Sequence, residues 1–271
     1  MTDPKRDVAT FWNRASCGED LLLETTDRAG YAEQARQRYA LEPEILEFAP
    51  FALSRGKKVL EIGIGLGAEH QRFAEAGAVL HGIDLTERAI SHTKARLAAL
   101  GLSSTLALGD AENLPFADNT FDIVYAWGSL HHTPDTPRAF REVARVLRPG
   151  GIARIMIYSK WSVVGLMLWG RYALLRLRPW TSLAQIYAEH MESPGTKAYT
   201  TRQARELMAG LVNIEIRTVL THGDLLESAV GQRHRGPILT IARKCWPRWF
   251  IRRALGKWGL YMLMSGTRPS A

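Results

Sequence analysis

The sequence predicts an α/β fold: a doubly wound sheet of seven strands, mostly parallel with an antiparallel last strand, plus helical insertions. Short apolar segments of strand length alternate with segments of helix length from residue 58 to residue 158. Three alternating glycines directly follow the first apolar segment, and an acid ends the second. Because crossovers between parallel strands are right-handed, we expect helices on both faces of the sheet.

The first strand and the loop after it predict a ligand site. Residues 59–67 join an apolar run to three glycines, which let the backbone take positive φ and approach a ligand closely. Residues 68–76 are expected to form the next helix, whose N-terminus favours negative charge. Gly63, Gly65 and Ala68 also satisfy the G-x-G-x-x-A pattern of dinucleotide-binding folds, so the loop alone indicates only a nucleotide-like cofactor.

Two acids further along the chain narrow the nature of this cofactor. The second predicted strand ends in Asp84, about 20 residues past the glycines, where a carboxylate can hold both hydroxyls of a ribose. A third unit contains Asp110, and residues 121–128 predict a fourth strand. With these motifs, and with the turn at residues 146–151, the sequence resembles the class I S-adenosylmethionine-dependent methyltransferases. The resemblance covers about residues 58–158.

This resemblance implies a Rossmann-like core, S-adenosylmethionine as cofactor, S-adenosylhomocysteine as product, and methyl transfer to an O or N atom of a small molecule. In this family the acid two positions before the first glycine lies near the methionyl amine, the strand-end acid holds the ribose, and the acid of the third unit reads the adenine edge. Trp127 would lie beside the methionyl part and the methyl group. The cofactor-binding residues implied are Glu61, Gly63, Gly65, Gly67, Asp84, Leu85, Asp110, Ala111, Glu112 and Trp127.

Other functions remain open at this point. A dinucleotide oxidoreductase is disfavoured because its third strand has no reason to end in Asp-Ala-Glu and no dehydrogenase-like catalytic pair is visible. A second alternative is that these glycines and acids have only a structural role, in turns and at strand ends. This alternative explains each motif alone but not the occurrence of all of them in order. Two alternatives use the same fold: an enzyme that cyclises or cleaves S-adenosylmethionine to methylthioadenosine, and a non-catalytic module that only binds the cofactor.

The segment before the core predicts a helical lid. Phe11, Trp12 and Tyr39 are similar to residues of a bacterial subgroup of these methyltransferases, and in related enzymes the N-terminal helices fold over the cofactor. Trp12 and Tyr39 are therefore expected to close the cofactor pocket and to exclude water around a charged sulfonium. The alternative is that the two aromatic residues at positions 11 and 12 only anchor a helix on the core.

The chain is expected to be one globular domain. Its parts are a lid over residues 1–57, a cofactor-binding core over 58–159, a helical cap insertion over 160–212, and closing strands with a basic, Trp-rich helical excursion over 213–271. Within the lid, residues 11–13 and 17–19 are expected to mark a loop, and residues 31–51 are expected to form one helix.

Methyl transfer is an in-line displacement, so alignment alone can supply about 7–11 kcal/mol of the barrier. His131 and His132 follow the fourth strand, where an imidazole can serve as general base, with His131 favoured. Tyr158 ends the fifth strand and is the third candidate for catalysis or substrate contact. The alternative is that both histidines open the next helix and bond to backbone. We expect no metal, because neighbouring histidines on a helix cannot face one ion.

Positive charge and tryptophan gather late in the chain. Of 35 Lys and Arg residues, 9 lie from residue 228 onward with no acid, which leaves 26 basic residues against all 27 acids in the rest. Six of the eight tryptophans lie in this stretch or in the cap insertion, and we expect both segments to form the outer wall of the acceptor pocket. Such a surface fits peripheral contact with an anionic membrane or an anionic or amphiphilic substrate, while nucleic acid ranks last. A solvated basic face is the alternative.

The cysteine content fits a reducing cytoplasm, where we expect the protein to be located. Cys17 and Cys245 are the only cysteines, which suggests neither a disulfide framework nor a thiolate metal site. No signal peptide is evident at the polar N-terminus. Residues 161–175 are the most apolar segment, but Arg171 interrupts them and they are too short to span a bilayer. The sequence predicts no particular oligomeric state.

Overall fold

The computed structural model describes residues 3–227 and 244–270. Seven strands form one sheet in the order β3-β2-β1-β4-β5-β7-β6, and β7 is antiparallel to both of its neighbours while the other pairs are parallel. This confirms the predicted fold class. The strands are β1 (Lys58–Ile62), β2 (Val79–Asp84), β3 (Thr105–Leu108), β4 (Phe121–Trp127), β5 (Leu147–Tyr158), β6 (Val212–Val219) and β7 (Tyr261–Thr267).

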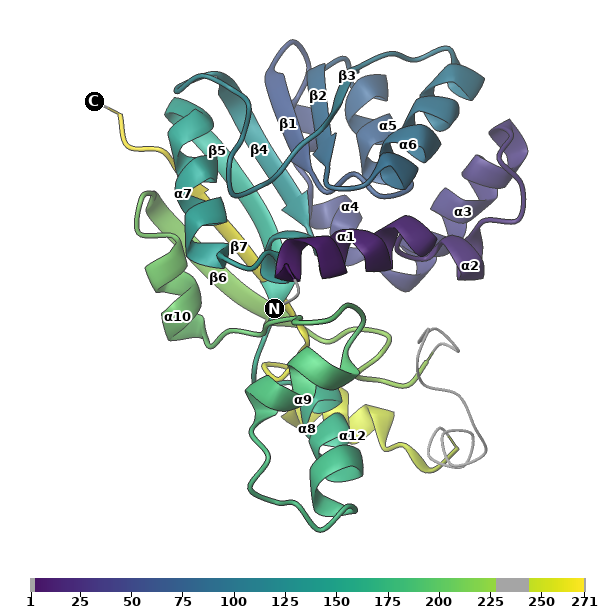
Figure 1. The fold of residues 1–271 in the computed structure, drawn as a ribbon, viewed down its shortest axis with the longest axis vertical. Coiled ribbons are helices and arrows are strands. Elements are labelled where there is room, and N and C mark those ends of the chain that lie inside the picture. Colours follow the sequence, from purple (N-terminus) through teal and green to yellow (C-terminus); the bar gives the residue numbers. More distant parts are fainter. Residues whose placement is uncertain (1–2, 228–243, 271) are drawn as a thin grey trace.

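Helices cover both faces of the sheet (Figure 1). The described helices are α1 (Pro4–Arg14), α2 (Glu19–Leu22), α3 (Arg28–Leu41), α4 (Glu44–Phe48), α5 (Ala68–Glu75), α6 (Glu87–Leu100), α7 (Thr136–Val146), α8 (Val163–Trp169), α9 (Leu183–His190), α10 (Thr201–Leu207) and α12 (Arg248–Ala254), with short turns η1 (Phe51–Leu53), η2 (Leu130–His132) and η3 (Gly170–Leu174). None of these helices is long and apolar enough to cross a membrane.

Alternation along the strands divides the core into two layers. In β4, Val124 packs with α7 and α10 on one face, while Ile123 and Tyr125 pack with α4 and α5 on the other. Side chains alternate between the two faces of a strand, so a strand covered on both faces must be apolar throughout. This explains the continuous apolar runs in the sequence.

The glycine loop after β1 needs glycine for two different reasons. Gly63 and Gly67 have φ of 80° and 74°, a region that other residues rarely adopt. A Cβ on Gly63 would also lie 2.3 Å from the Cβ of Ser129, whose hydroxyl donates to the Ile62 carbonyl at 2.7 Å. The loop after β4 is therefore fastened directly against the loop after β1.

The N-terminal segment differs from two expectations. Residues 11–13 belong to helix α1 instead of a loop. The helix expected over residues 31–51 is broken into α3, α4 and η1, because Pro43 disfavours helical geometry at Glu42, where α3 ends with φ −128° and ψ 62°.

The insertion after β5 builds a lobe beyond the carboxyl ends of the parallel strands. Helices α8 and α9 of this insertion form it together with α12, which lies between β6 and β7; the lobe is below the sheet in Figure 1. Ile251 of α12 packs with Val163 of α8 and with Leu225. Asp224 fastens this lobe to the sheet: its carboxylate accepts from the backbone N–H groups of Val164 at 3.0 Å and Leu260 at 2.9 Å, and from both the N–H and the hydroxyl of Thr221 at 2.9 Å.

We expect Asp224→Ala to lower the free energy of unfolding by several kcal/mol, since each buried donor left unsatisfied costs about 1–3 kcal/mol. Denaturant unfolding measures this loss. Asp118→Ala is the control, because the Asp118 side chain is 68% exposed and its ion pair with Arg145 lies at the surface. Equal stability of the two variants would show that Asp224 does not fasten the lobe.

Candidate functional site

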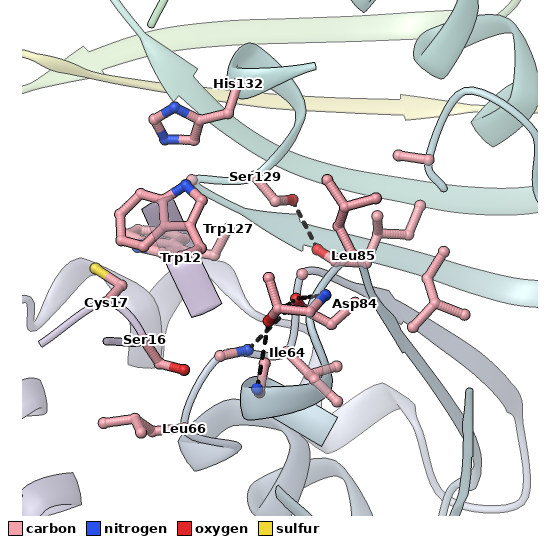
Figure 2. Close-up of a pocket in the computed structure, with 18 of the residues that line it drawn as sticks. Trp12, Ser16, Cys17, Ile64, Leu66, Asp84, Leu85, Trp127, Ser129 and His132 are labelled. Atoms are coloured by element: carbon pink, nitrogen blue, oxygen red, sulfur yellow. Dashed lines mark hydrogen bonds between the residues drawn. The ribbon is translucent and has the colours of Figure 1, made fainter. Parts of the chain in front are cut away.

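One cavity opens at the carboxyl edge of the sheet. It takes a residue from the end of each of five parallel strands or from the loop that follows, and one from the start of β7, which reaches the same edge because β7 is antiparallel. In sheet order these residues are Asp110, Asp84, Gly63, Trp127, Tyr158 and Tyr261. Helix α1 passes beside this edge (Figure 1). Figure 2 shows Trp12, Trp127 and His132 gathered on one side of the pocket and Asp84 on the other.

Asp84 is held in place by the chain around it. Its Oδ1 accepts from the backbone N–H of Thr86 at 3.0 Å and from the Thr86 hydroxyl at 2.8 Å, and its Oδ2 accepts from the Gly65 N–H at 3.3 Å. Burial raises the pKa of Asp84, while these hydrogen bonds oppose the rise. The predicted residues Gly65, Gly67 and Leu85 also line the cavity.

Lys5 of α1 meets the acids that follow β3. Its Nζ lies 2.6 Å from Asp110 Oδ2 and 2.6 Å from Glu112 Oε2. Asp110 and Ala111 line the cavity, whereas Glu112 lies outside the lining and accepts the N–H of Asp135 at 2.6 Å. Sequence reasoning missed Lys5, because nothing near Lys5 in the sequence indicates these acids.

A charged cluster beside the glycine loop was also missed. The Arg38 guanidinium donates to Glu69 at 2.8 and 3.1 Å and lies 3.2 Å from Glu42, and all three residues line the cavity. Burial alone would lower the pKa of Arg38, but the two carboxylates raise it by more than burial lowers it. The pKa of Arg38 is therefore well above its ordinary value. Tyr39, which was predicted to close the pocket, lies outside the lining with its ring 5.7 Å from the Arg72 guanidinium carbon.

Glu61 lies behind the glycine loop. It is buried, its Oε2 lies 2.9 Å from His70 Nδ1, and the Nε2 of that ring lies 2.8 Å from the Ser104 hydroxyl. Burial raises the pKa of Glu61 well above its ordinary value and lowers the pKa of His70 to about 3. The structure therefore does not bring Glu61 to the cavity surface, and its contact with a methionyl amine stays a prediction.

Two tyrosine–carboxylate pairs line the half of the cavity over β5 and β7. The Tyr158 hydroxyl donates to Glu192 at 3.0 Å, and the Tyr261 hydroxyl donates to Glu42. The two phenol rings are stacked with centroids 6.1 Å apart, and Trp127 meets Tyr261 edge-on at 5.5 Å. Among the described residues of the cap insertion, Glu192 alone lines the cavity, and none of the cap tryptophans does so. The cap insertion thus contributes one described residue to the wall of the cavity, and residues 228–243 of the basic stretch lie outside the described residues, so the expectation that both segments form the outer wall stays a prediction.

The two histidines occupy different environments. His132 lines the cavity, with its ring centroid 5.5 Å from that of Trp12. His131 lies outside the lining, 4.1 Å from the Tyr158 ring, and neither of its ring nitrogens finds a hydrogen-bond partner among the described residues. His132 is therefore better placed than His131 to meet a ligand.

Two hydroxyl groups from the cap insertion hold the Nδ1 side of the His132 ring. The Thr196 hydroxyl donates to the Ser193 carbonyl at 2.7 Å, so its oxygen is left as an acceptor. Nδ1 of His132 lies 2.8 Å from the Ser193 hydroxyl and 3.2 Å from that of Thr196. When Nδ1 carries the proton it donates to these two hydroxyls, which leaves Nε2 with a lone pair; when Nδ1 is unprotonated it accepts from the Ser193 hydroxyl instead. Burial, with the Lys197 charge adding to it, lowers the pKa of His132 to about 3, so the ring is neutral at pH 7.

Comparison with known proteins agrees with this geometry. Residues 60–155 match a family model described as a methyltransferase domain. The chain carries a class I S-adenosylmethionine-dependent methyltransferase domain. This domain is 38% identical over 102 residues to methyltransferase GfsG of Streptomyces halstedii, covering 36% of this chain and 37% of that protein. It is 38% identical over 102 residues to the 27-O-demethylrifamycin SV methyltransferase of Amycolatopsis mediterranei, covering 36% and 38%.

The chain thus spans under two fifths of the length of these relatives in sequence. A solved structure extends the likeness in fold. Phosphoethanolamine N-methyltransferase 2 of Haemonchus contortus, in complex with S-adenosyl-L-methionine, superimposes with a TM-score of 0.62 at 18% identity and covers 100% of this chain and 61% of that one. At this identity the likeness concerns the fold.

We expect His132 to make the protein less stable as the pH falls. Its pKa is about 3 when folded and about 6.5 when unfolded, so the unfolded state binds more protons between these values. Above pH 6.5 the ring is neutral in both states, and the free energy of unfolding does not depend on its protonation. Below pH 6.5 the free energy of unfolding falls by up to about 1.4 kcal/mol per pH unit. His132→Asn keeps a polar amide near the position of Nδ1 and removes the titration. Unfolding by urea from pH 7 to pH 5 should show a smaller loss in this variant, and identical losses would contradict the burial of a neutral ring.

Proposed function

We propose that the protein transfers a methyl group from S-adenosylmethionine to an O or N atom of a small-molecule acceptor. The observation that carries the proposal is the division of the cavity along the sheet. The half over β3, β2 and β1 has the carboxylates and glycines that suit a nucleoside, and the half over β4, β5 and β7 has aromatic rings with proton acceptors. A cofactor and an acceptor that met in this cavity would lie side by side.

The cofactor half fits S-adenosylmethionine group by group. Asp84 has a buried, fixed carboxylate with lone pairs left for two ribose hydroxyls. Arg38 and Glu69 border the glycine loop. The positive charge of Arg38 suits the carboxylate of the methionyl part of the cofactor, and the negative charge of Glu69 suits its ammonium group. Asp110 and Ala111 stand where an adenine would lie past the ribose. When bound, the cofactor supplies a methyl group on a positively charged sulfur.

The charge of the cavity suits a cation. Its described lining contains five carboxylates and two basic side chains, and each basic side chain is bound to two carboxylates. The carboxylates are Glu42, Glu69, Asp84, Asp110 and Glu192. This excess of negative charge supports a sulfonium cofactor and favours a neutral or protonated acceptor over the anionic acceptor expected from the basic C-terminal stretch.

Two side chains of the cavity can accept the proton that the methyl acceptor releases. Neutral His132 presents a lone pair at Nε2 in the tautomer whose Nδ1–H donates to Ser193 and Thr196, and this is the form that would accept the proton. Glu192 accepts the Tyr158 hydroxyl and provides a second proton acceptor. Among the relatives, one name describes an O-methyltransferase of rifamycin and the solved structure an N-methyltransferase of phosphoethanolamine, which supports both acceptor atoms. We place the reaction in the cytoplasm, where the free thiols of Cys17 and Cys245 stay reduced.

The products identify the reaction class. The protein is incubated with S-adenosylmethionine and a panel of primary amines, secondary amines, phenols and alcohols, and products are read by mass spectrometry. S-adenosylhomocysteine together with a methylated acceptor is the expected result. Methylthioadenosine formed without an acceptor would show that the protein cyclises or cleaves the cofactor and would overturn this proposal. Binding of the cofactor without any turnover would show a cofactor-binding module instead.

We expect Asp84→Asn to weaken binding of S-adenosylhomocysteine by at least tenfold, and Asp84→Ala to weaken it further. The carboxylate would accept two charge-assisted bonds from ribose hydroxyls, each worth about 1.5–3 kcal/mol. Titration calorimetry measures the affinity, and Asp118→Ala is the matched control at the surface. Unchanged affinity in both Asp84 variants would refute the assignment of the ribose site, and equal affinity for NAD would favour an oxidoreductase.

We expect His132→Asn to lower turnover by about 10²–10⁴ while binding of S-adenosylhomocysteine stays nearly the same, because a general base acts only in the chemical step. His131→Asn is the matched comparison, since His131 is buried outside the cavity lining. Formation of S-adenosylhomocysteine with an acceptor from the panel gives the rate. A larger loss in the His131 variant would transfer the role to that residue.

A further inference from the structure

The loop after η3 exposes large apolar side chains in a single run. Residues 174–180, which we call the tip, are all exposed. Within the tip Leu175, Leu177 and Trp180 are 80%, 82% and 78% exposed, and Leu174 is 52% exposed. Isolated apolar side chains at a surface are common, but four in seven consecutive residues mark an interaction site.

The backbone of the tip is strained where its most exposed leucine lies. Leu177 has φ of 56°, a conformation that favours glycine or asparagine. The turn is closed by hydrogen bonds from the Leu177 N–H to the Leu174 carbonyl at 3.0 Å and from the Arg178 N–H to the Ala173 carbonyl at 2.8 Å. A glycine would form this turn without strain. The leucine side chain has almost no packing within the chain that would offset the strain, which points to a contact outside the chain.

Position and anchoring make the tip available to a surface. Helix α8 and η3 together run for 12 residues, from Val163 to Leu174, about 18 Å at helical rise. The tip follows at the end of the lobe remote from the sheet, at the bottom of Figure 1. The start of α8 is fixed, because Asp224 accepts the Val164 N–H and the Ser162 hydroxyl caps the helix at Gly165.

The charged residues near the tip in the sequence are all basic. Residues 160–188 contain four basic residues and no acid: Lys160, Arg171, Arg176 and Arg178. The guanidinium carbons of Arg171 and Arg176 lie 5.2 and 5.1 Å from the centre of the Tyr172 ring. In the described parts of the chain no carboxylate forms an ion pair with the arginines at 171, 176 and 178. These arginines are therefore available to negative charge from outside.

The basic helix α12, by contrast, uses two of its three arginines within the lobe. Arg248 donates to the backbone carbonyls of Leu225 and Leu226 at 2.9 and 3.1 Å, and Arg252 forms an ion pair with Glu227. Residues 228–243 of the basic stretch lie outside the described residues. The tip thus carries free positive charge next to a run of exposed apolar side chains. Arg253 of α12, whose guanidinium carbon lies 6.0 Å from the centre of the exposed Trp249 ring, shares this character, so a membrane contact of the Trp-rich C-terminal helix stays a prediction.

We propose that the tip binds the surface of a bilayer containing anionic lipids, with Leu174, Leu175, Leu177 and Trp180 in the boundary between headgroups and acyl chains. Alternating arginines would then lie at the level of the lipid phosphates. A second copy of the chain fits less well, because a stable protein interface buries about 800 Å² per partner and a two-fold contact would place like arginines against each other. The contact does not depend on methyl transfer.

The experiment uses the full chain and sedimentation with vesicles. Vesicles of phosphatidylcholine with about 30% phosphatidylserine should bind the protein, and vesicles of phosphatidylcholine alone should bind it weakly, since each basic residue near an anionic surface contributes about fivefold to affinity. Changing Arg176→Gln and Arg178→Gln together should lower affinity for the anionic vesicles and reduce its dependence on salt. Equal binding to both kinds of vesicle would overturn the proposal.

Leu177→Gly separates binding from folding. Glycine accepts the positive φ, so this variant should unfold at the same or a higher temperature while its vesicle affinity falls. Leu53→Ser is the matched control, because Leu53 is 57% exposed on η1, outside the lobe, and it should bind vesicles like the parent protein. Unchanged vesicle binding in Leu177→Gly, or a dimer in solution that this variant abolishes, would refute lipid as the partner. Binding of S-adenosylhomocysteine, measured in parallel, should be unchanged.

Discussion

The parallel arrangement of the strands is the constraint on which the site depends. Parallel strands end at one edge, so acids and aromatic residues that are far apart in the sequence arrive next to each other without any direct bond between them. The antiparallel β7 completes the row because its first residue, Tyr261, enters at the edge where Tyr158 leaves. The stacked pair of phenols exists only in this register, and a strand in the other direction would place Tyr261 at the far edge.

Charge pairing fastens the N-terminal helices over this edge. Lys5 binds the acids after β3, Glu19 binds Arg88 of α6 at 2.6 Å, and Arg38 binds Glu69 of α5. The lid brings both basic groups of the cavity lining, while the core and the insertion bring most of its carboxylates. Arg38 is held by two carboxylates of the lining, so this contact both closes the lid and leaves the cavity one negative charge, whereas the second partner of Lys5, Glu112, lies outside the lining.

Local sequence patterns predicted the fold, but they could not predict contacts between side chains that are far apart in the sequence. The turn at Gly63 and the strand-end acid Asp84 follow from backbone geometry that only certain residues allow, so single positions reveal them. Arg38 and Glu192 reach the cavity from α3 and from the insertion, and their roles depend on partners that no spacing encodes. Glu61 illustrates the limit: its place in the motif is as expected, but its buried partner His70 holds it behind the loop.

The inserted segment joins two surfaces with opposite charge. Glu192 points a carboxylate into the cavity just after α9 ends at His190, whereas the tip with its arginines lies before α9 begins at Leu183. The eight residues of α9 span about 12 Å, which is longer than the Debye length of about 8 Å at physiological salt. Positive charge on the tip is therefore screened from the cavity by solvent. The electrostatics that select a cofactor or an acceptor and those that attract an anionic surface can differ in sign within one insertion.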